Sequence, residues 1–315
     1  MKYVLGVDGG ATKTVFKAKD TENDFVVEVV KGSSNIKSNG LVETGKNITD
    51  GIKEIVERLK KEFPSFSIFS SACFGVAGLD FELDKKSYES IIFSKENRKY
   101  FIPSKTIICN DSRIGLEAGS TSPNRLMLIC GTGSNCYGIN ESGQEAGSNG
   151  WDYILGDEGS AYSIATKALR AIMRAFDGRG DNTSLSNSVL EYLGFSSELE
   201  LVHWAYKNTI SKNDIAAITS LVCVTANAGD QMSKKILEGE CDEAILTVST
   251  VIKKLKLENS CFDLVLVGSV FNCKKYYKDL FMSEINKRFS GVNIKKPVKK
   301  PVEGAIKLAL EKLNN

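Results

Sequence analysis

The segment Asp8-Gly9-Gly10-Ala11-Thr12-Lys13-Thr14 carries residue types that can bind a phosphate group. Consecutive glycines let main-chain N–H groups approach an anion without interference from a Cβ atom, while threonine hydroxyls and the Lys13 ammonium add further donors. Asp8 follows a short apolar run, where its carboxylate could hold a hydrated Mg²⁺ ion beside the phosphates. A plain glycine hairpin turn is the alternative interpretation of this segment.

A second glycine turn, Gly131-Thr132-Gly133-Ser134, also lies between two strand-like runs. The strand–turn–strand patterns at 3–18 and 126–139 indicate an internal repeat. A third glycine turn, Gly268-Ser269, follows another apolar run. Together the turns predict a nucleotide site, because two such hairpins in two domains can hold a triphosphate from opposite sides. The sequence has no G-x-x-x-x-G-K-[ST] phosphate loop and no G-x-G-x-x-G segment between a strand and a helix.

Length and composition narrow the functions to be considered. The 315 residues suffice for two domains, and a formal net charge of +2 gives no support to a nucleic-acid partner. His203 is the only histidine, which leaves little for histidine-based metal sites or Ser–His catalysis. No apolar run reaches the length of a membrane span. The eight cysteines form no C-x-x-C pair and are expected to be mostly buried free thiols in a reducing cytoplasm.

Hydrophobic periodicity predicts a mixture of strands and helices. Strands are expected at 3–7, 15–18, 25–30, 72–76, 106–109, 126–130, 136–139 and 262–267. Helices are expected at 43–63, 159–176, 185–193, 198–208, 212–238, 242–257 and 303–313. A small, polar stretch at 116–124 indicates a domain boundary. The predicted domains are residues 1–120, joined by a C-terminal helix at 302–315, and residues 121–301.

Further segments occur in order along the chain with these turns. They are Gly75-Val76-Ala77-Gly78, Asn110-Asp111, Ile129-Cys130-Gly131-Thr132-Gly133-Ser134-Asn135, Gly150-Trp151, Gly156-Asp157-Glu158-Gly159-Ser160-Ala161-Tyr162 and Val267-Gly268-Ser269-Val270-Phe271. Over nearly the whole chain, the series resembles the BadF/BadG/BcrA/BcrD ATPase family of the sugar kinase/actin/heat-shock protein superfamily, and in particular its N-acetylglucosamine kinase branch. The resemblance implies an α/β fold in which two ribonuclease-H-like (actin-like ATPase) domains flank a nucleotide/sugar cleft.

The resemblance also implies roles for individual residues. Asp111 matches the catalytic base, and its place at the end of an apolar strand suits a carboxylate that takes a hydroxyl proton. The implied substrate-binding residues are Asn35, Asn110, Asp111, Thr132, Gly150, Trp151 and Asp157. The predicted nucleotide-binding residues are Gly9, Gly10, Ala11, Thr12, Lys13, Thr14, Gly131, Thr132, Gly133, Gly268 and Ser269, with Asp8 as the metal ligand. Asp157 could instead cap a helix, and Trp151 could instead lie in the core.

The sequence therefore predicts a cytoplasmic amino-sugar kinase that uses ATP and Mg²⁺ and forms a homodimer, with no nucleic-acid or membrane partner. The expected reaction is phosphorylation of the 6-hydroxyl of N-acetylglucosamine in cell-wall amino-sugar salvage. The site would also accept N-acetylmuramic acid if Lys37 binds its lactyl carboxylate, although a solvated surface lysine is the simpler interpretation. The sequence does not rank these two sugars and glucosamine.

Two other functions would use the same phosphate-binding turns. One is an iron–sulfur ATPase that activates a 2-hydroxyacyl-CoA dehydratase or an enzyme of the benzoyl-CoA reductase type, and the other is a non-enzymatic nucleotide or sugar sensor. The segments Gly150-Trp151 and Gly156–Ser160 favour the kinase over the first. The set of Asp8, Asp111 and Asp157 favours the kinase over the second.

Overall fold

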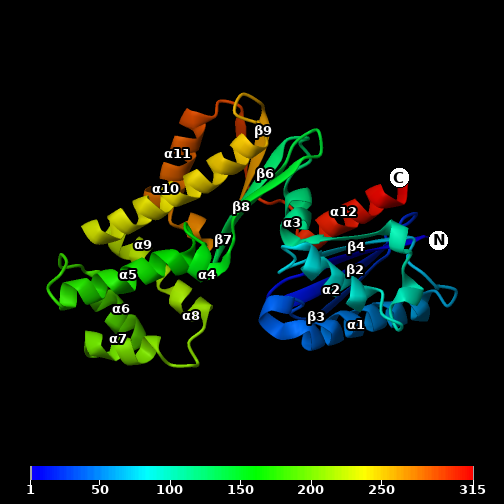
Figure 1. Ribbon diagram of the computed structural model, residues 1–315, viewed down its shortest axis with the longest axis horizontal. Helices are drawn as coiled ribbons and strands as arrows, with labels where there is room; N and C mark the ends of the chain where they lie inside the picture. The colour runs from blue at the N-terminus through cyan, green and yellow to red at the C-terminus, as the bar shows by residue number, and fades with distance from the viewer. Residues whose placement is uncertain (1, 315) are drawn as a thin grey trace. The chain divides into compact units, whose positions relative to one another are not determined.

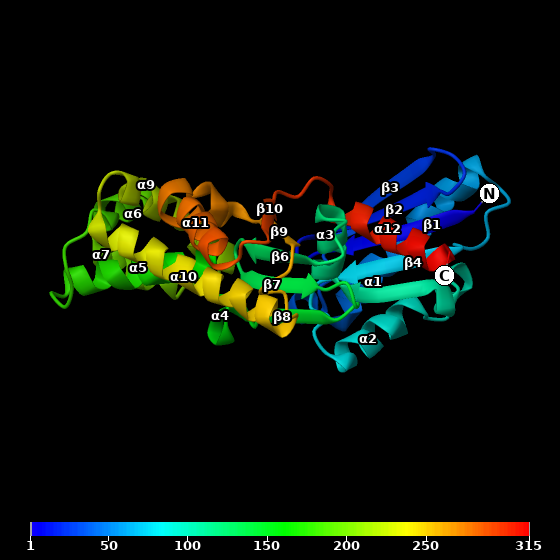
Figure 2. The same cartoon turned by 90° about the horizontal axis from the view of Figure 1, so that it is seen from above.

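The computed structural model describes residues 2–314, and their contacts divide the chain into two units. The first unit runs up to Thr121 and resumes at Pro297, and the second unit is Ser122–Lys296. Each unit contains a five-stranded sheet with helices packed against it, as Figures 1 and 2 show. The two sheets and their helices agree with the predicted α/β class.

The sheet of the first unit has the strand order β3-β2-β1-β4-β5. Its strands are β1 (Tyr3–Gly9), β2 (Lys13–Asp20), β3 (Val26–Gly32), β4 (Ser71–Val76) and β5 (Thr106–Asn110). The first three form an antiparallel meander, whereas β1, β4 and β5 run parallel. Because Gly9 pairs with Val76 and Val76 pairs with Asn110, the three parallel strands end at one edge of the sheet.

Both faces of this sheet are covered by helices (Figure 1). The helices of the unit are α1 (Ile36–Glu62), α2 (Glu82–Ile92), α3 (Asp111–Gly119) and α12 (Pro301–Asn314). Successive side chains of a strand point to opposite faces. Leu5 of β1 accordingly packs with α1, while Val4 packs with Ile114 of α3 and Ala305 of α12. Burial on both faces explains the near-continuous apolar runs of β1 and β4.

The second sheet repeats the topology of the first. Its strands are β6 (Arg125–Cys130), β7 (Ser134–Ile139), β8 (Glu145–Asn149), β9 (Phe262–Val267) and β10 (Val292–Lys295). Their spatial order, β8-β7-β6-β9-β10, matches that of the first unit, with an antiparallel meander followed by two parallel pairings. The repeat inferred from the two glycine turns thus extends to whole sheets. Strand β8 was not expected, because Glu145-Ala146-Gly147-Ser148-Asn149 lacks β-branched and aromatic residues.

The second unit is rich in helices. They are α4 (Asp152–Leu155), α5 (Ala161–Phe176), α6 (Leu185–Leu193), α7 (Glu198–Ala205), α8 (Lys212–Ala217), α9 (Thr219–Asn227), α10 (Gln231–Lys254) and α11 (Asp279–Arg288). Helices α5 and α10 share one core with the inward residues Leu126, Leu128 and Cys130 of β6 (Figure 2). Within the described residues, no helix combines the length and the apolar character needed to cross a membrane.

The predicted boundaries of the helices at 212–238 and 242–257 are wrong. The structure has a break between α8 and α9 at Ile218, a second break at Gly229 and Asp230, and no break near residue 240. Gly229 has a φ of 111°, which favours glycine, and the Asp230 side chain accepts a hydrogen bond from the Ser233 N–H as the N-cap of α10. A chain break and a cap therefore determine this boundary, whereas the apolar periodicity continues through it.

Two of the eight cysteines are not free thiols as predicted. Cys223 of α9 and Cys273 form a disulfide, with their Cα atoms 5.6 Å apart. That separation lies within the range a disulfide requires. The prediction of free thiols is therefore wrong for these two residues, which are brought together from positions 50 residues apart. The remaining six, Cys73, Cys109, Cys130, Cys136, Cys241 and Cys261, are free, and Cys261 alone among them is exposed.

Close backbone approach holds α12 against the first unit. Gly304 lies on the helix face toward α3, and a Cβ atom there would overlap the Ile114 carbonyl oxygen. Gly6 of β1 has a similar role, since its Cβ would lie 2.8 Å from the Ile306 backbone nitrogen. The C-terminal helix α12 therefore packs against β1 and α3 at positions where only glycine fits.

We expect Gly304→Ala to lower the free energy of unfolding by about 1–3 kcal/mol or more, because the added methyl must displace backbone atoms. The matched control is Gly239→Ala on α10, where a Cβ would meet no atom within 4 Å. The control should raise stability by up to about 1 kcal/mol through helix propensity. Urea unfolding followed by circular dichroism measures both effects. An equal change in the free energy of unfolding in the two variants would contradict the packing described for α12.

Candidate functional site

Two carboxylates stand at the common edge of the parallel strands in the first unit. Asp8 is the penultimate residue of β1, and Asp111 begins α3 directly after β5. Burial, and next the negative charge of Asp8, raises the pKa of Asp111 to about 6. Burial also raises the pKa of Asp8, an effect that the positive charge of Lys13 opposes. The edge therefore concentrates negative charge, with one carboxylate poised to exchange a proton near neutral pH.

The first glycine turn is a tight, exposed hairpin. The Gly10 N–H donates to the Lys13 carbonyl at 3.0 Å, and Ala11, Thr12 and Lys13 are exposed. A Cβ on Gly9 would overlap the Ser34 hydroxyl, so packing alone requires glycine there. Among the predicted phosphate ligands, Thr14 differs from its neighbours. It is fully buried and donates its hydroxyl to the Gly32 carbonyl at 2.7 Å.

Asn35 lies beside the loop that follows β4. Its side-chain oxygen accepts from the Lys37 N–H at 2.9 Å as the N-cap of α1. Gly78 has a φ of 79°, and a Cβ there would lie 2.5 Å from the same Asn35 oxygen. Tyr88 joins the two segments, because its hydroxyl oxygen lies 2.8 Å from the Ser34 carbonyl oxygen and 2.7 Å from that of Ala77. Sequence reasoning missed Tyr88, since an apolar helix face gives no sign of a polar contact at its tip.

Asn110 has a capping role in the structure. Its side-chain oxygen accepts from the Ser112 N–H at 2.9 Å as the N-cap of α3. Its amide nitrogen donates to the Leu79 carbonyl at 3.0 Å and to Asp80 at 3.3 Å. Asp80 also forms an ion pair with Lys37, whose side chain is 44% exposed, and this pair ties Lys37 to the loop after β4. These contacts fix the direction in which the adjacent Asp111 enters the strand edge.

The second glycine turn joins β6 to β7 and contacts the start of helix α5. The Gly131 N–H donates to the Gly133 carbonyl at 2.9 Å, and the Gly131 carbonyl accepts from the Ala161 N–H at 2.8 Å. Gly268 follows β9 with a φ of 116°, and a Cβ there would overlap the Cys130 carbonyl oxygen. Because the backbone at Gly268 lies this close to Cys130, the next residue, Ser269, lies near the second glycine turn. The parallel pairing of β6 with β9 thus joins two segments far apart in the sequence.

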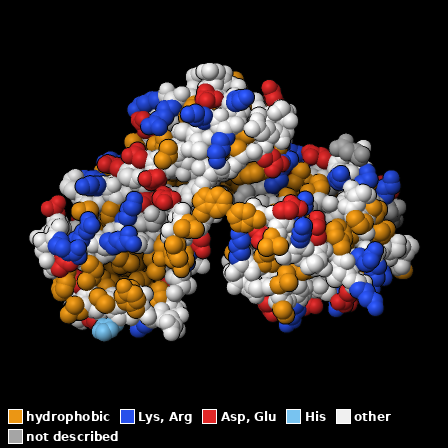
Figure 3. Space-filling model, in the orientation of Figure 1, with side chains coloured by type: hydrophobic (Ala, Val, Ile, Leu, Met, Phe, Trp, Pro, Cys, Tyr) orange, Lys and Arg blue, Asp and Glu red, His pale blue; other side chains and the backbone are white. Residues whose placement is uncertain are grey.

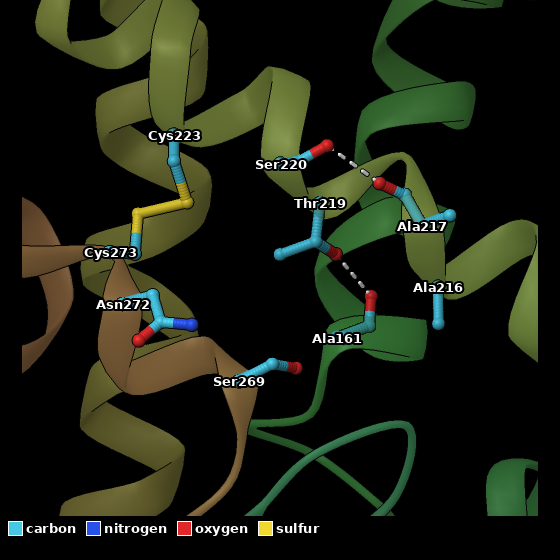
Figure 4. A pocket seen from close by; sticks show the side chains of 9 residues that line it. All are labelled: Ala161, Ala216, Ala217, Thr219, Ser220, Cys223, Ser269, Asn272 and Cys273. Carbon is cyan, nitrogen blue, oxygen red and sulfur yellow. Dashed lines mark hydrogen bonds between the residues drawn. A yellow bond between two sulfur atoms is a disulfide. The ribbon is translucent and has the colours of Figure 1, made fainter.

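A pocket of about 360 Å³ opens beside these segments (Figure 4). Its lining consists of small and polar side chains, namely Ala161, Ala216, Ala217, Thr219, Ser220, Cys223, Ser269, Asn272 and Cys273. Two of its hydroxyls are held by backbone carbonyls, Thr219 by Ala161 at 2.6 Å and Ser220 by Ala217 at 2.9 Å. The volume falls within the range of small-molecule sites. Of the predicted nucleotide-binding residues, Ser269 lines this pocket.

Asp157 lies next to the second glycine turn. Only 4% of its surface is exposed, and its backbone has a φ of 66°. Its carboxylate accepts from the Ser134 N–H at 3.1 Å and from Lys212 at 2.6 Å. The N-cap of α5 is Ser160, whose hydroxyl accepts from the Ser163 N–H. The capping interpretation of Asp157 is therefore wrong, and a carboxylate can accept more hydrogen bonds than these two.

Trp151 is 54% exposed, which excludes the core interpretation of this residue. It follows Gly150, whose φ of 80° favours glycine, and it precedes the short helix α4. Thr132, in contrast, is engaged within the protein, because its hydroxyl donates to the Asn213 side chain at 2.8 Å. Lys212 and Asn213 are contacts that sequence reasoning missed, since neither belongs to a glycine turn or a strand end.

We expect the Asp111 carboxyl to titrate near pH 6 in the protein free of nucleotide and metal. Carbon-13 NMR of the carboxyl groups measures this midpoint. Replacing Asp8 by Asn removes the neighbouring like charge and should lower the midpoint. A midpoint near the ordinary value of about 4, unchanged in the Asp8→Asn variant, would contradict the proximity of the two groups.

The amino-acid sequence is similar to those of known proteins over nearly its whole length. The model of the BadF/BadG/BcrA/BcrD ATPase family matches residues 5–310. The N-acetylmuramic acid/N-acetylglucosamine kinase of Clostridium acetobutylicum is 36% identical over 295 residues, covering 93% of this chain and 94% of that protein. The N-acetyl-D-glucosamine kinase of Dictyostelium discoideum is 32% identical over 316 residues, covering 97% of each.

Solved structures share the fold. A provisionally named N-acetylglucosamine kinase from Chromobacterium violaceum matches with a TM-score of 0.72 at 18% identity, covering 98% of this chain and 99% of that chain. The ROK hexokinase of Thermus thermophilus matches with a TM-score of 0.55 at 13% identity, covering 98% and 97%. These likenesses confirm the predicted fold class, the two-domain actin-like ATPase fold of sugar kinases. With its family model matched from residue 5 to residue 310, the chain belongs to the BadF/BadG/BcrA/BcrD ATPase family.

Proposed function

We propose that this protein is an ATP-dependent amino-sugar kinase that phosphorylates the 6-hydroxyl of N-acetylglucosamine. The observation that carries the proposal is the Asp111 carboxylate at the strand edge, with a pKa of about 6 beside Asp8. Above that pH the group is ionised and can take the proton of a sugar hydroxyl. Its basicity lies close to the operating pH, which is the range in which a general base works well.

The reaction is a displacement at phosphorus. The sugar oxygen forms a bond to the γ-phosphorus of ATP, the bond to the β,γ-bridging oxygen breaks, ADP leaves, and Asp111 takes the hydroxyl proton. Lys13 and the backbone N–H groups of the exposed residues Ala11 and Thr12 would offer positive charge to the phosphates. Asn110 and Asp80 act indirectly, since they fix the start of the helix that carries Asp111.

Asp8 is suited to hold Mg²⁺. The negative charge that Asp8 and Asp111 place at one edge, which Lys13 offsets in part at Asp8, would be relieved by a divalent cation. Among the described residues, no cluster of three or more acidic, His or Cys side chains could hold a metal by itself. Mg²⁺ commonly binds one or two carboxylates and completes its shell with water and phosphate oxygens, which fits Asp8. When bound, the ion neutralises charge on the phosphates.

We assign the nucleotide base and ribose to the pocket beside Ser269. Small residues line it, and backbone carbonyls hold its hydroxyls in place, which suits a flat, polar-edged ring (Figure 4). The turn at 131–133 lies next to this pocket through the contact of Gly268 with Cys130. Phosphates extending from the pocket would therefore reach the second glycine turn, as the predicted roles of Gly131, Thr132 and Gly133 require.

In the second unit the sugar is assigned to Trp151 and Asp157, and in the first unit Asn35 keeps its predicted role in sugar binding. Asn35 and Asp157 supply acceptors, and the exposed Trp151 ring offers an apolar face. N-acetylmuramic acid is a second substrate in this proposal, on the basis of the name of the Clostridium relative. Its lactyl carboxylate would share the Lys37 ammonium with Asp80. The names of both curated relatives favour the kinase over an iron–sulfur ATPase activator.

We further propose a homodimer in the cytoplasm, the compartment in which cells keep ATP. Exposed hydrophobic side chains occur on α6, on α7 and at the residue that follows α7, in a region where Figure 3 shows apolar surface. They are Tyr192, Leu199, Val202 and Tyr206. Contiguous apolar surface of this kind marks interaction sites, and a second copy of the chain would cover it.

A coupled ADP-release assay tests the function. N-acetylglucosamine, N-acetylmuramic acid, glucosamine and glucose are compared with a sample that contains no sugar. We expect ADP release to depend on an N-acetylated amino sugar. Asp111→Asn should lower kcat by about 10²–10⁴-fold, the usual contribution of a general base, with ATP affinity unchanged.

The control is Asp24→Asn, an exposed turn aspartate of the same unit that should keep full activity. ADP release that no sugar stimulates would refute the kinase proposal. An Asp111→Asn variant as active as the control would refute the base assignment alone.

A further inference from the structure

Lys212 places a positive charge between two aspartates in the second unit. Its ammonium lies 2.6 Å from an Asp152 oxygen and 2.6 Å from an Asp157 oxygen. The same ammonium lies 5.5 Å from the Tyr153 ring centroid and 5.8 Å from that of Tyr162. Burial favours the neutral amine, but the hydrogen bonds to the two aspartates more than compensate and leave the pKa of Lys212 raised. The side chain is therefore a fixed cation.

Asp157 needs this cation. Its carboxylate is nearly buried, and its backbone adopts a left-handed conformation that few residues take without support. A buried carboxylate without a charged partner is costly, so its place depends on the groups around it. One of its oxygens is held by the Ser134 N–H, and the other is held by Lys212. Lys212 thus fixes the direction in which the remaining acceptor positions of Asp157 point.

The helix that carries Lys212 also reaches the glycine turn and the pocket. Asn213, the next residue, accepts the hydroxyl hydrogen bond of Thr132 at 2.8 Å. Ala216 and Ala217, at the other end of α8, line the pocket (Figure 4). The helix has 6 residues, so its two ends are only about 9 Å apart. A reciprocal capping box between Ser211 and Asp214 holds its start.

We propose that Lys212 is a positioning residue that orients Asp157 for the sugar, and that α8 links this orientation to occupancy of the nucleotide pocket. The inference rests on the proposed function, in which Asp157 binds sugar. A ligand in the pocket contacts Ala216 and Ala217 and so restrains α8, which then holds Lys212 against Asp157. Each ligand should consequently strengthen binding of the other, as linkage requires.

Calorimetric binding of N-acetylglucosamine, with and without a non-hydrolysable ATP analogue, tests the proposal. In the native protein the analogue should tighten sugar binding by about 5-fold or more. Lys212→Met, which removes the charge and keeps the length, should weaken sugar binding by about 10-fold or more and reduce the effect of the analogue to below about 2-fold. Lys212→Arg should restore part of both. The matched control, Lys207→Met, alters an exposed lysine close by in the chain and should match the native protein.

Steady-state kinetics supply a second readout. Because Lys212 acts through sugar binding, its replacement should raise KM for the sugar more than it lowers kcat. The proposal would be overturned if Lys212→Met bound the sugar as tightly as the control variant does and showed the same tightening by the ATP analogue. So would an analogue that fails to tighten sugar binding in the native protein.

Asp152→Asn covers the case in which Lys212→Met does not fold. Asp152 has a φ of 63°, which Asn tolerates, and its side chain is 69% exposed, so the variant should fold. Loss of one of its two anchors should loosen Lys212 and weaken sugar binding by about 3-fold. An unchanged affinity would overturn the positioning role. A native protein that binds no amino sugar would instead refute the proposed function, which separates the two failures.

Discussion

Parallel pairing of strands is the constraint on which the rest of this structure depends. In the first unit, the pairing of β1, β4 and β5 brings Asp8, the loop at Gly78 and the Asn110-Asp111 junction to one edge. In the second unit, the pairing of β6 with β9 brings the turn at 131–133 and Gly268 together in the same way. Carboxyl ends of parallel strands are where open α/β sheets place their ligands. The chemistry of the protein is therefore assembled by sheet register, and the helices fix the direction of each side chain.

Asp111 and Asp157 differ in their surroundings, and this difference suits the two carboxylates to the different roles proposed for them. Burial and the charge of Asp8 disfavour the ionised form of Asp111, and among the described residues no Lys or Arg forms an ion pair with it. Asp157 is instead paired with Lys212 and held by the Ser134 N–H. A carboxyl whose pKa lies near 6 can take up a proton during a reaction, whereas a carboxylate locked by a cation is suited to accept fixed hydrogen bonds.

Local signals in the sequence located the glycine turns, most strands and Asp111, because a turn and an apolar run depend on neighbouring residues only. Strand β8 was missed, since sheet pairing alone makes Glu145–Asn149 extended. The contacts of Tyr88, Asp80 and Lys212 were also beyond sequence reasoning, because each joins segments that lie far apart in the chain. The Cys223–Cys273 bridge was missed for the same reason. The motif Gly156–Ser160 singled out Asp157, but only the structure shows that its carboxylate is buried and paired with Lys212.

In the proposed reaction, the strand-edge carboxylate directs a phosphoryl group to the primary hydroxyl of an amino sugar. Phosphorus-31 NMR of a mixture of enzyme, ATP, Mg²⁺ and N-acetylglucosamine tests it most directly. We expect a new phosphomonoester signal whose phosphorus couples to the two protons on C6. A spectrum that shows ATP converted only to ADP and inorganic phosphate, or an ester coupled to the anomeric proton, would contradict it.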